Sequence, residues 1–206
     1  MPIELAPHHK FGLVLPSSVM PASGIFGYGD LYRDLVDVSA LGAMVTHPVS
    51  YRPRHASRGQ QVAVHGEHVL IHTGWPNPGL RRVIRRYGRL WSRFPVPVIV
   101  HLLATTPSEV GKAADRLSAL EGVDGIELGL AEDTTLQACL DLLHAAQFEG
   151  ALPIIVKIPH GRVAELALPL EEAGADALTL TAPPRAVLPR FEEEEMLPSK
   201  FIRGRL

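Results

Sequence analysis

The sequence predicts an α/β fold of the TIM-type (β/α)8 barrel class, with about six of the eight βα units. Short apolar runs alternate with segments of helical periodicity along most of the 206 residues. Two segments, EGVDGIEL and EAGADALTL, repeat one order of features: a helix end, a glycine turn, an acidic residue and a buried strand. Strands that are apolar throughout are typical of a parallel sheet covered on both faces.

Six strands can be counted, and a closed barrel of this class needs eight. The count therefore stops two βα units short, and the tail after Thr181 shows no strand pattern. The expected strands are Val19–Ala22, Ala43–Thr46, Pro97–Leu103, Gly125–Leu130, Pro153–Ile158 and Ala177–Thr181. Two unpaired sheet edges favour association, so we expect a homo-oligomer or a partner subunit that completes the barrel.

Helices are expected between the strands, within a single domain that covers residues 1–206. Leu31, Leu35, Val38 and Leu41 stand at near-helical spacing in the first of them. Thr106 is a plausible N-cap, with a proline in the following turn. The expected helices are Asp30–Leu41, Leu80–Trp91, Pro107–Leu120, Thr134–Ala146 and Val163–Ala173. A long insertion at about 48–78 is expected to hold a hairpin of Gln61–Val64 and Val69–Ile71.

The composition excludes several classes of function. The net charge of −2 leaves no basic surplus for nucleic acid or an anionic membrane. The single cysteine, Cys139, excludes an internal disulfide framework and a cysteine zinc site. No apolar run approaches the roughly 20 residues of a membrane helix, and the N-terminus does not read as a signal peptide. We therefore expect a soluble cytoplasmic protein with a small-molecule substrate.

The stretch VMPASGIFGYGDLY places glycines at 24, 27 and 29 before any helix can begin. Three glycines are more than one turn requires, and a backbone without side chains lets a ligand approach closely. A plain turn between a strand and a helix is the alternative interpretation.

This stretch and two later ones carry a resemblance to a known family. VMPASGIFGYGDLYRDLVDVSALGAMVT, PVIVHLLATTPSEVGKAADRLSALEGVDGIEL and LPIIVKIPHGRVAELALPLEEAGADALTL resemble class 1 dihydroorotate dehydrogenases, especially the kind that pairs with an electron-transfer subunit. The resemblance runs from about Ile3 to about Leu180. It implies a (β/α)8 barrel with FMN at its C-terminal face and the oxidation of dihydroorotate to orotate in pyrimidine synthesis.

The resemblance assigns residues to the flavin. In the family, Pro-Ala-Ser-Gly lies under the ring, and Ala22, Ser23 and Gly24 match it. The flavin lysine of the fifth strand matches Lys157. A lysine within an apolar strand needs a polar cavity or a partner, and a salt bridge with Glu127 is the alternative. The family's phosphate cradle follows strands seven and eight, beyond the last expected strand, which bears on whether FMN is held conventionally.

Other family positions carry different residues here. His47 stands at the position of a flavin lysine, and His101 at that of a flavin asparagine. In the substrate loop, Gly74 and Asn77 keep the pattern N-x-x-G-L-x-N, while Ile71 replaces its first asparagine. We therefore expect His47 and His101 to contact a cofactor, and Gly74 and Asn77 to contact a substrate.

The fourth strand departs most from the family. Where the family reads N-x-S-C-P-N and uses the cysteine as the base, this sequence has Gly129 and Glu132. Glu132 is thus a candidate base, and its alternative role is to cap the next helix together with Asp133. The sixth-strand asparagine is Ala182. Each lost amide partner would cost about 1–3 kcal/mol, so the three losses are expected to abolish most of the recognition of dihydroorotate.

Three interpretations of the function stay open. The chain is either a flavoprotein oxidoreductase with a divergent substrate, or a catalytically inactive paralogue or partner subunit that keeps the scaffold. A metal-dependent hydrolase is a third interpretation, since histidines gather near the expected strand ends. These are His47, His65, His68, His72, His101 and His160. Loop histidines are usually solvated, however, which argues against a metal site.

Five arginines lie on the helix Leu80–Trp91. They could bind phosphate or an acidic partner, but a solvated basic face is the favoured interpretation.

Overall fold

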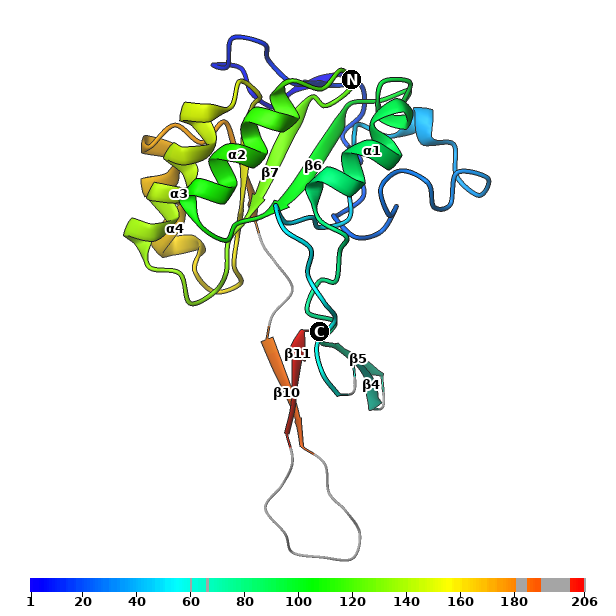
Figure 1. The fold of residues 1–206 in the computed structure, drawn as a ribbon, viewed down its shortest axis with the longest axis vertical. Helices are drawn as coiled ribbons and strands as arrows, with labels where there is room; N and C mark the ends of the chain where they lie inside the picture. The colour runs from blue at the N-terminus through cyan, green and yellow to red at the C-terminus, as the bar shows by residue number, and fades with distance from the viewer. Residues whose placement is uncertain (60, 66, 181–184, 190–200, 206) are drawn as a thin grey trace, which may run out of the picture.

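Five parallel strands form the centre of the computed structural model, which describes residues 1–59, 61–65, 67–180, 185–189 and 201–205. The sheet has the strand order β3-β6-β7-β8-β9 and is curled, with helices along its outside (Figure 1). Its strands are β3 (Met44–Val45), β6 (Val98–Leu103), β7 (Gly125–Gly129), β8 (Ile154–Ile158) and β9 (Ala177–Leu180). The arrangement is an incomplete TIM-type α/β fold, as the sequence predicted.

Helices connect and cover the strands. Figure 1 shows α2, α3 and α4 side by side on one flank of the sheet, and α1 apart from them. They are α1 (Leu80–Trp91), α2 (Pro107–Ser118), α3 (Leu136–Glu149) and α4 (Val163–Glu172). The predicted cap is confirmed, because Thr106 accepts a hydrogen bond from the backbone N–H of Glu109. Among the described residues, no helix has the length and apolar character that spanning a membrane requires.

Side chains alternate between the two faces of the sheet, because successive strand residues point to opposite sides. In β6, Val98, Val100 and Leu102 join the large core beneath the helices. Ile99 joins a smaller core on the inner face. Residues beside the short hairpin of β1 (Ile3–Glu4) and β2 (Val14–Leu15) complete this smaller core. The next inner residue of β6 is His101, so the inner face changes from apolar to polar toward the carboxyl ends of the strands.

A second sheet, with the order β10-β11-β5-β4, lies below the parallel sheet in Figure 1, on the side where the chain leaves β9. It contains β4 (Val62–His65), β5 (His68–Ile71), β10 (Arg185–Pro189) and β11 (Phe201–Arg205). The predicted hairpin is confirmed as β4 and β5. The absence of strands after Thr181 was a wrong prediction, since β10 and β11 pair there. Pairing between distant segments leaves no local periodicity to detect.

The helix predicted at Asp30–Leu41 is wrong. Only its end forms a 3-10 helix, η1 (Val38–Ala40), capped by Asp37. Tyr32 has a φ of 59°, which no α-helix accommodates. Asp30 accepts a hydrogen bond from the N–H of Tyr28, a local contact that competes with helix formation. Leu35, expected on a buried face, is 79% exposed.

The strand predicted at Val19–Ala22 is also wrong, so the parallel sheet has five strands rather than six within the described residues. One backbone bond links this segment toward β3: Gly42 donates to the carbonyl of Val19 at 2.7 Å. Pro21 has no N–H to extend a ladder from this contact.

Candidate functional site

Four polar side chains meet on the inner face where the parallel strands end. His101 of β6 lies opposite Glu127 of β7 in the sheet register, and Lys157 of β8 lies opposite Thr179 of β9. His101, Lys157 and Thr179 each follow an apolar residue of the inner core by two positions, so their side chains point to the same inner face. Glu127 lies between two residues of the outer core and therefore also points inward. We call these four residues the mouth cluster. The carboxyl ends of barrel strands are the usual place for an active site.

Glu127 is the centre of the mouth cluster and is 4% exposed. Its Oε2 atom is bonded to Nδ1 of His101. Its Oε1 atom accepts a hydrogen bond of 2.7 Å from the hydroxyl of Thr179. Nζ of Lys157 lies 3.8 Å from Oε2, which confirms the salt bridge that the sequence suggested. The carboxylate thus holds side chains from three other strands.

These contacts decide the ionisation of Glu127. Burial alone would raise its pKa. The hydrogen bond from His101, the charge of Lys157 and the hydroxyl of Thr179 act in the opposite direction, and the pKa is lowered overall. Glu127 is therefore an anion at neutral pH, and its charge is balanced inside the mouth rather than by solvent.

The residues predicted to lie under the flavin reach the mouth cluster. Oγ of Ser23 accepts a hydrogen bond of 3.3 Å from Nζ of Lys157. Gly24 has a φ of 98°, and a Cβ built there would meet no heavy atom within 4 Å. Ala22 is exposed on the same turn. The turn Ala22–Gly24 therefore presents bare backbone to open space beside the partly buried Lys157.

His47 lies just beyond β3, among aromatic rings. Its ring is 5.7 Å from that of Tyr28 and 6.4 Å from that of Trp75, both at steep angles. Burial lowers the pKa of His47, and the nearby His101 lowers it further, against a hydrogen bond with the backbone of Pro76. A neutral imidazole at neutral pH follows.

Gly74 and Asn77 lie in the loop between β5 and α1, where Asn77 is 7% exposed. The Oδ1 atom of Asn77 accepts from the N–H groups of Ser50 at 3.2 Å and Gly79 at 3.0 Å. Its Nδ2 atom donates to the carbonyl of Trp75 at 3.1 Å. The amide expected to bind substrate is thus bonded to its own loop and to Ser50 in the segment after β3, so it ties these two segments together.

Glu132 lies in the connection between β7 and α3, three residues beyond Gly129. Its carbonyl accepts a hydrogen bond of 3.0 Å from Arg162, which also pairs with Glu165. The loop is therefore fastened to the start of α4. Ala182, at the position of the family's sixth-strand asparagine, lies outside the described residues.

Sequence reasoning missed the relationship between His101 and Gly129. A Cβ built on Gly129 would lie 2.6 Å from Nε2 of His101, closer than real Cβ contacts allow. The imidazole can take its place only because residue 129 has no side chain. Both positions carry asparagine in the family that the sequence resembles. Their simultaneous replacement by histidine and glycine could have indicated that the two residues are in contact.

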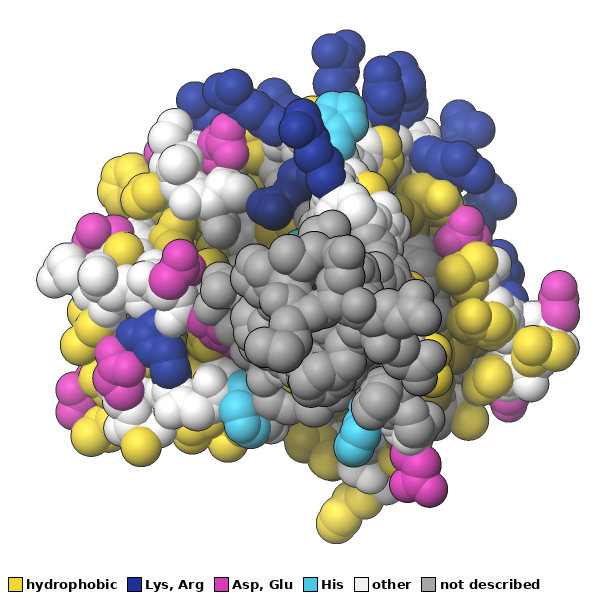
Figure 2. Space-filling view, turned by 90° about the horizontal axis from the view of Figure 1, so that it is seen from below, with side chains coloured by type: hydrophobic (Ala, Val, Ile, Leu, Met, Phe, Trp, Pro, Cys, Tyr) yellow, Lys and Arg dark blue, Asp and Glu magenta, His cyan; other side chains and the backbone are white. Residues whose placement is uncertain are grey.

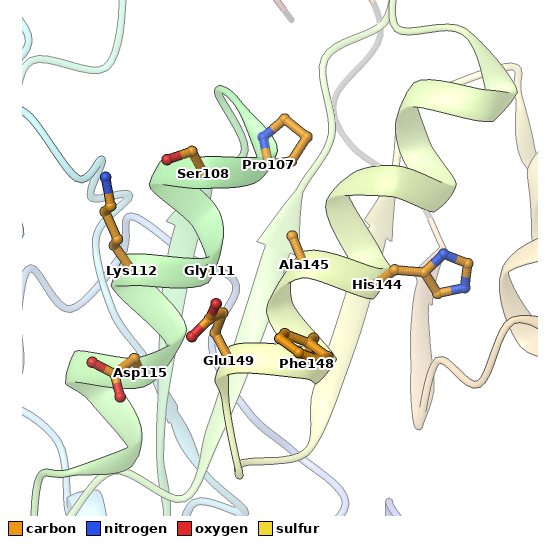
Figure 3. A pocket seen from close by; sticks show the side chains of 9 residues that line it. All are labelled: Pro107, Ser108, Gly111, Lys112, Asp115, His144, Ala145, Phe148 and Glu149. Atoms are coloured by element: carbon orange, nitrogen blue, oxygen red, sulfur yellow. The ribbon is translucent and has the colours of Figure 1, made fainter.

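Other surface features do not involve the predicted site residues. A groove of about 620 Å³ lies between α2 and α3, where Phe148 is 87% exposed (Figure 3). Lys and Arg side chains gather along one edge of the face in Figure 2. The five arginines of α1 are all exposed, as expected for a solvated face. Among the described residues, no group of three or more His, Cys, Asp or Glu is arranged to hold a metal ion.

The chain is similar in sequence to catalytic subunits of dihydroorotate dehydrogenase B (NAD(+)). It is 30% identical to that of Geobacillus sp. (strain WCH70) over 181 residues, which cover 82% of this chain and 58% of the relative. The identity is 29% with the subunit of Bacillus pumilus (strain SAFR-032), over the same shares. It is 30% with that of Desulforudis audaxviator (strain MP104C), of which 59% is covered. The chain thus spans less than two thirds of these relatives' length.

The fold comparison agrees with the sequence comparison. The structure superimposes on the crystal structure of DHODH from Eimeria tenella in complex with ferulenol with a TM-score of 0.66. The match covers 83% of this chain and 57% of that one, at 13% identity, so it supports the fold alone. No protein-family model matches the chain.

Proposed function

We propose that this chain, a homologue of the catalytic subunits of dihydroorotate dehydrogenase B, is a flavin-dependent oxidoreductase of the dihydroorotate dehydrogenase type. The observation that carries the proposal is the hydrogen bond between Ser23 and Lys157. It joins the two segments that the resemblance assigns to the flavin, although they are far apart in sequence. Without a common ligand, nothing would require the glycine turn and the partly buried Lys157 to lie together at the ends of the strands.

The residues present fit an FMN-type flavin. The bare backbone of Ala22–Gly24 offers the close approach that a flat ring needs. Lys157 brings a positive charge whose other neighbour, Glu127, keeps it in place. A flavin, when bound, supplies the acceptor for a hydride from a C–H bond beside a carbonyl. The protein's part is to orient the substrate, exclude water and take the proton.

The loop of Gly74 and Asn77 is proposed to shape the substrate side of the mouth. His47 connects this loop to the mouth, since its ring contacts Trp75 and lies near His101. The resemblance selects Glu132 as the base, whereas the buried pair of His101 and Glu127 offers a second proton acceptor.

A second candidate function is a binding scaffold without turnover, either a paralogue or a subunit of a larger assembly. The internal bonding of Asn77 favours it, since this amide is then not free for a substrate. Exposed apolar side chains before β3 would suit a second copy or a completing partner subunit. They are Ile25, Leu31, Tyr32, Leu35 and Val36.

Anaerobic reduction separates the two candidates. The chain is loaded with FMN, freed of excess cofactor and mixed with dihydroorotate while the flavin absorbance is followed. Bleaching that yields orotate supports the oxidoreductase. A bound flavin that keeps its absorbance with dihydroorotate but loses it with dithionite supports the scaffold and contradicts turnover of this substrate.

A further inference from the structure

One ring nitrogen in the mouth cluster is left for a ligand. His101 is 4% exposed, and its Nδ1 atom is bonded to Glu127. Within the part of the chain that the structure describes, no hydrogen bond is made to its Nε2 atom. This nitrogen points at the space above Gly129, where a Cβ would lie only 2.6 Å away. A buried imidazole thus presents a single polar atom at the end of the strands.

The contacts of Glu127 fix which nitrogen carries the proton. An ionised carboxylate only accepts hydrogen bonds, so the bonded Nδ1 atom of His101 is the donor. The neutral ring then has its lone pair on Nε2. Thr179 and Lys157 hold the carboxylate from the other side, so the ring cannot turn without breaking this network. A base oriented by a hydrogen-bonded carboxylate is the arrangement that proton transfer requires.

We propose that His101 is the proton-accepting residue of this site and that Glu127 is its positioning residue. The proposal rests on the proposed function, because it needs a flavin as the two-electron oxidant. The C–H bond beside the substrate carbonyl breaks, and its proton forms a bond with the Nε2 lone pair. A bound flavin would supply the two-electron acceptor for the hydride that leaves the neighbouring carbon, so the substrate would gain a C=C bond.

The positions of His101 and Gly129 explain why the acceptor lies here. Both positions carry asparagine in the family that the sequence resembles, and Glu132 stands at the position of the family's cysteine base. The loss of the side chain at 129 makes room for the imidazole at 101. One basic ring therefore replaces two neutral amides, and the site regains an acceptor on a rigid strand instead of a loop.

Three charged or titratable groups face the ring. Glu127 of β7 is bonded to the ring, and Lys157 of β8 lies 3.8 Å from the same carboxylate. His47, which follows β3, is neutral at neutral pH because burial lowers its pKa. Protonation of His101 therefore converts an ion pair of Glu127 and Lys157 into a group with one net positive charge. That charge is offset only when substrate or cofactor carries an anion.

The first test needs neither substrate nor flavin. Nitrogen NMR of the chain labelled at histidine, with the His101 signals assigned from His101→Asn, reports the tautomer directly. We expect the proton on Nδ1 and a bare Nε2 at pH 8. Glu127→Gln should mix the two tautomers, because an amide can donate a hydrogen bond as well as accept one. A proton on Nε2 at pH 8, or a tautomer balance that is the same in Glu127→Gln, overturns the assignment.

Thr179→Val gives a milder version of the same test if Glu127→Gln does not fold. It removes one bond to the carboxylate and leaves the His101 pair intact. A smaller change of the His101 tautomer balance in the same direction is expected, and an unchanged balance in a folded variant contradicts the positioning role.

The second test follows reduction of the FMN-loaded chain by dihydroorotate from pH 5.5 to 8.5. His101→Asn should slow reduction about 100-fold or more and abolish the rise of the rate with pH. The exposed residue His144 provides the matched control, and His144→Asn should behave as the wild type. Unchanged rates in His101→Asn overturn the inference alone. A wild type that binds no flavin overturns the proposed function. The NMR measurement of the tautomer then still tests whether Nδ1 of His101 carries the proton.

Discussion

The Nζ atom of Lys157 lies 3.3 Å from the Oγ atom of Ser23, 134 residues earlier in the chain. This contact closes the inner face of the incomplete barrel, since it joins the glycine turn near the N-terminus to the strand β8. Lys157 also lies 3.8 Å from Glu127, so one lysine connects the turn to the mouth cluster. Loss of order in the turn Ala22–Gly24 is therefore expected to disturb the mouth cluster. Disruption of the mouth cluster is likewise expected to loosen the turn.

Replacing Gly24 by valine should remove flavin binding. The φ of 98° is accessible to glycine and costly for a β-branched residue, and the added side chain would project into the open space beside the turn. We expect flavin content after reconstitution to fall at least tenfold, with a loss of about 1–3 kcal/mol in stability. Absorbance of the reconstituted, desalted protein measures the first, and urea denaturation the second.

Gly59→Val is the matched control, because Gly59 has a φ of 84° and also meets no heavy atom within 4 Å. It should suffer the same backbone strain without losing flavin. Equal flavin content in the two variants would contradict the placement of the ring at Gly24.

Glu127→Gln should destabilise the protein strongly at neutral pH. Lys157 and His101 would lose their buried counter-charge, and breaking a buried pair from one side costs about 3–5 kcal/mol. Equilibrium urea denaturation at pH 7 measures this loss. A change below about 0.5 kcal/mol would show that the carboxylate contributes little to the fold.

The same residue predicts a pH dependence of stability. The folded-state pKa of Glu127 is lowered from its ordinary value of 4.5, so the unfolded chain binds this proton more readily. The contribution is therefore present above about pH 4.5 and is lost as pH falls through the folded-state pKa. Denaturation series at pH 7, 4 and 3 should show a steeper fall in the wild type than in Glu127→Gln. Parallel curves would argue against the ionised carboxylate.

Gly129→Ala should push the His101 ring out of its place. The new Cβ would lie 2.6 Å from Nε2, and such overpacking costs about 1–3 kcal/mol. In the background of His101→Ala the same substitution should cost much less, because the clash is gone. A double-mutant cycle by thermal or urea denaturation gives the coupling, and additive effects would contradict the geometry.

Asn77→Ala should lower stability by about 2–4 kcal/mol, because the N–H groups of Ser50 and Gly79 lose their acceptor. Asn77→Asp keeps an acceptor oxygen and should cost less. Urea denaturation of both variants measures the difference. A fully stable Asn77→Ala protein would return this amide to the substrate role that the family resemblance suggested.

The region from β6 to β9 was predictable within a few residues, and the reason is local. Each strand there is a mostly apolar run, and two of the helices begin at threonine caps, Thr106 before α2 and Thr135 before α3. The pairing of Lys157 with Glu127 followed from the cost of a buried lysine. Parity along the strands is enough to place both side chains on the inner face.

The remaining features depend on contacts that no local pattern contains. The segment Asp30–Leu41 has helical spacing, but turn bonds from its aspartates and the positive φ of Tyr32 prevent a helix. The strands β10 and β11 exist only through pairing with each other and with β5. The fit of His101 against Gly129 requires the register between two strands, which the sequence does not reveal.

The most direct test of the account is the visible absorption spectrum of the purified chain after incubation with FMN and removal of excess cofactor, compared with Lys157→Met. We expect the wild type to retain a flavin band, with FMN identified after acid release, and Lys157→Met to retain much less. A folded wild type that stays colourless, or a lysine variant that binds FMN equally well, would contradict the claim that Ser23 and Lys157 form a flavin site.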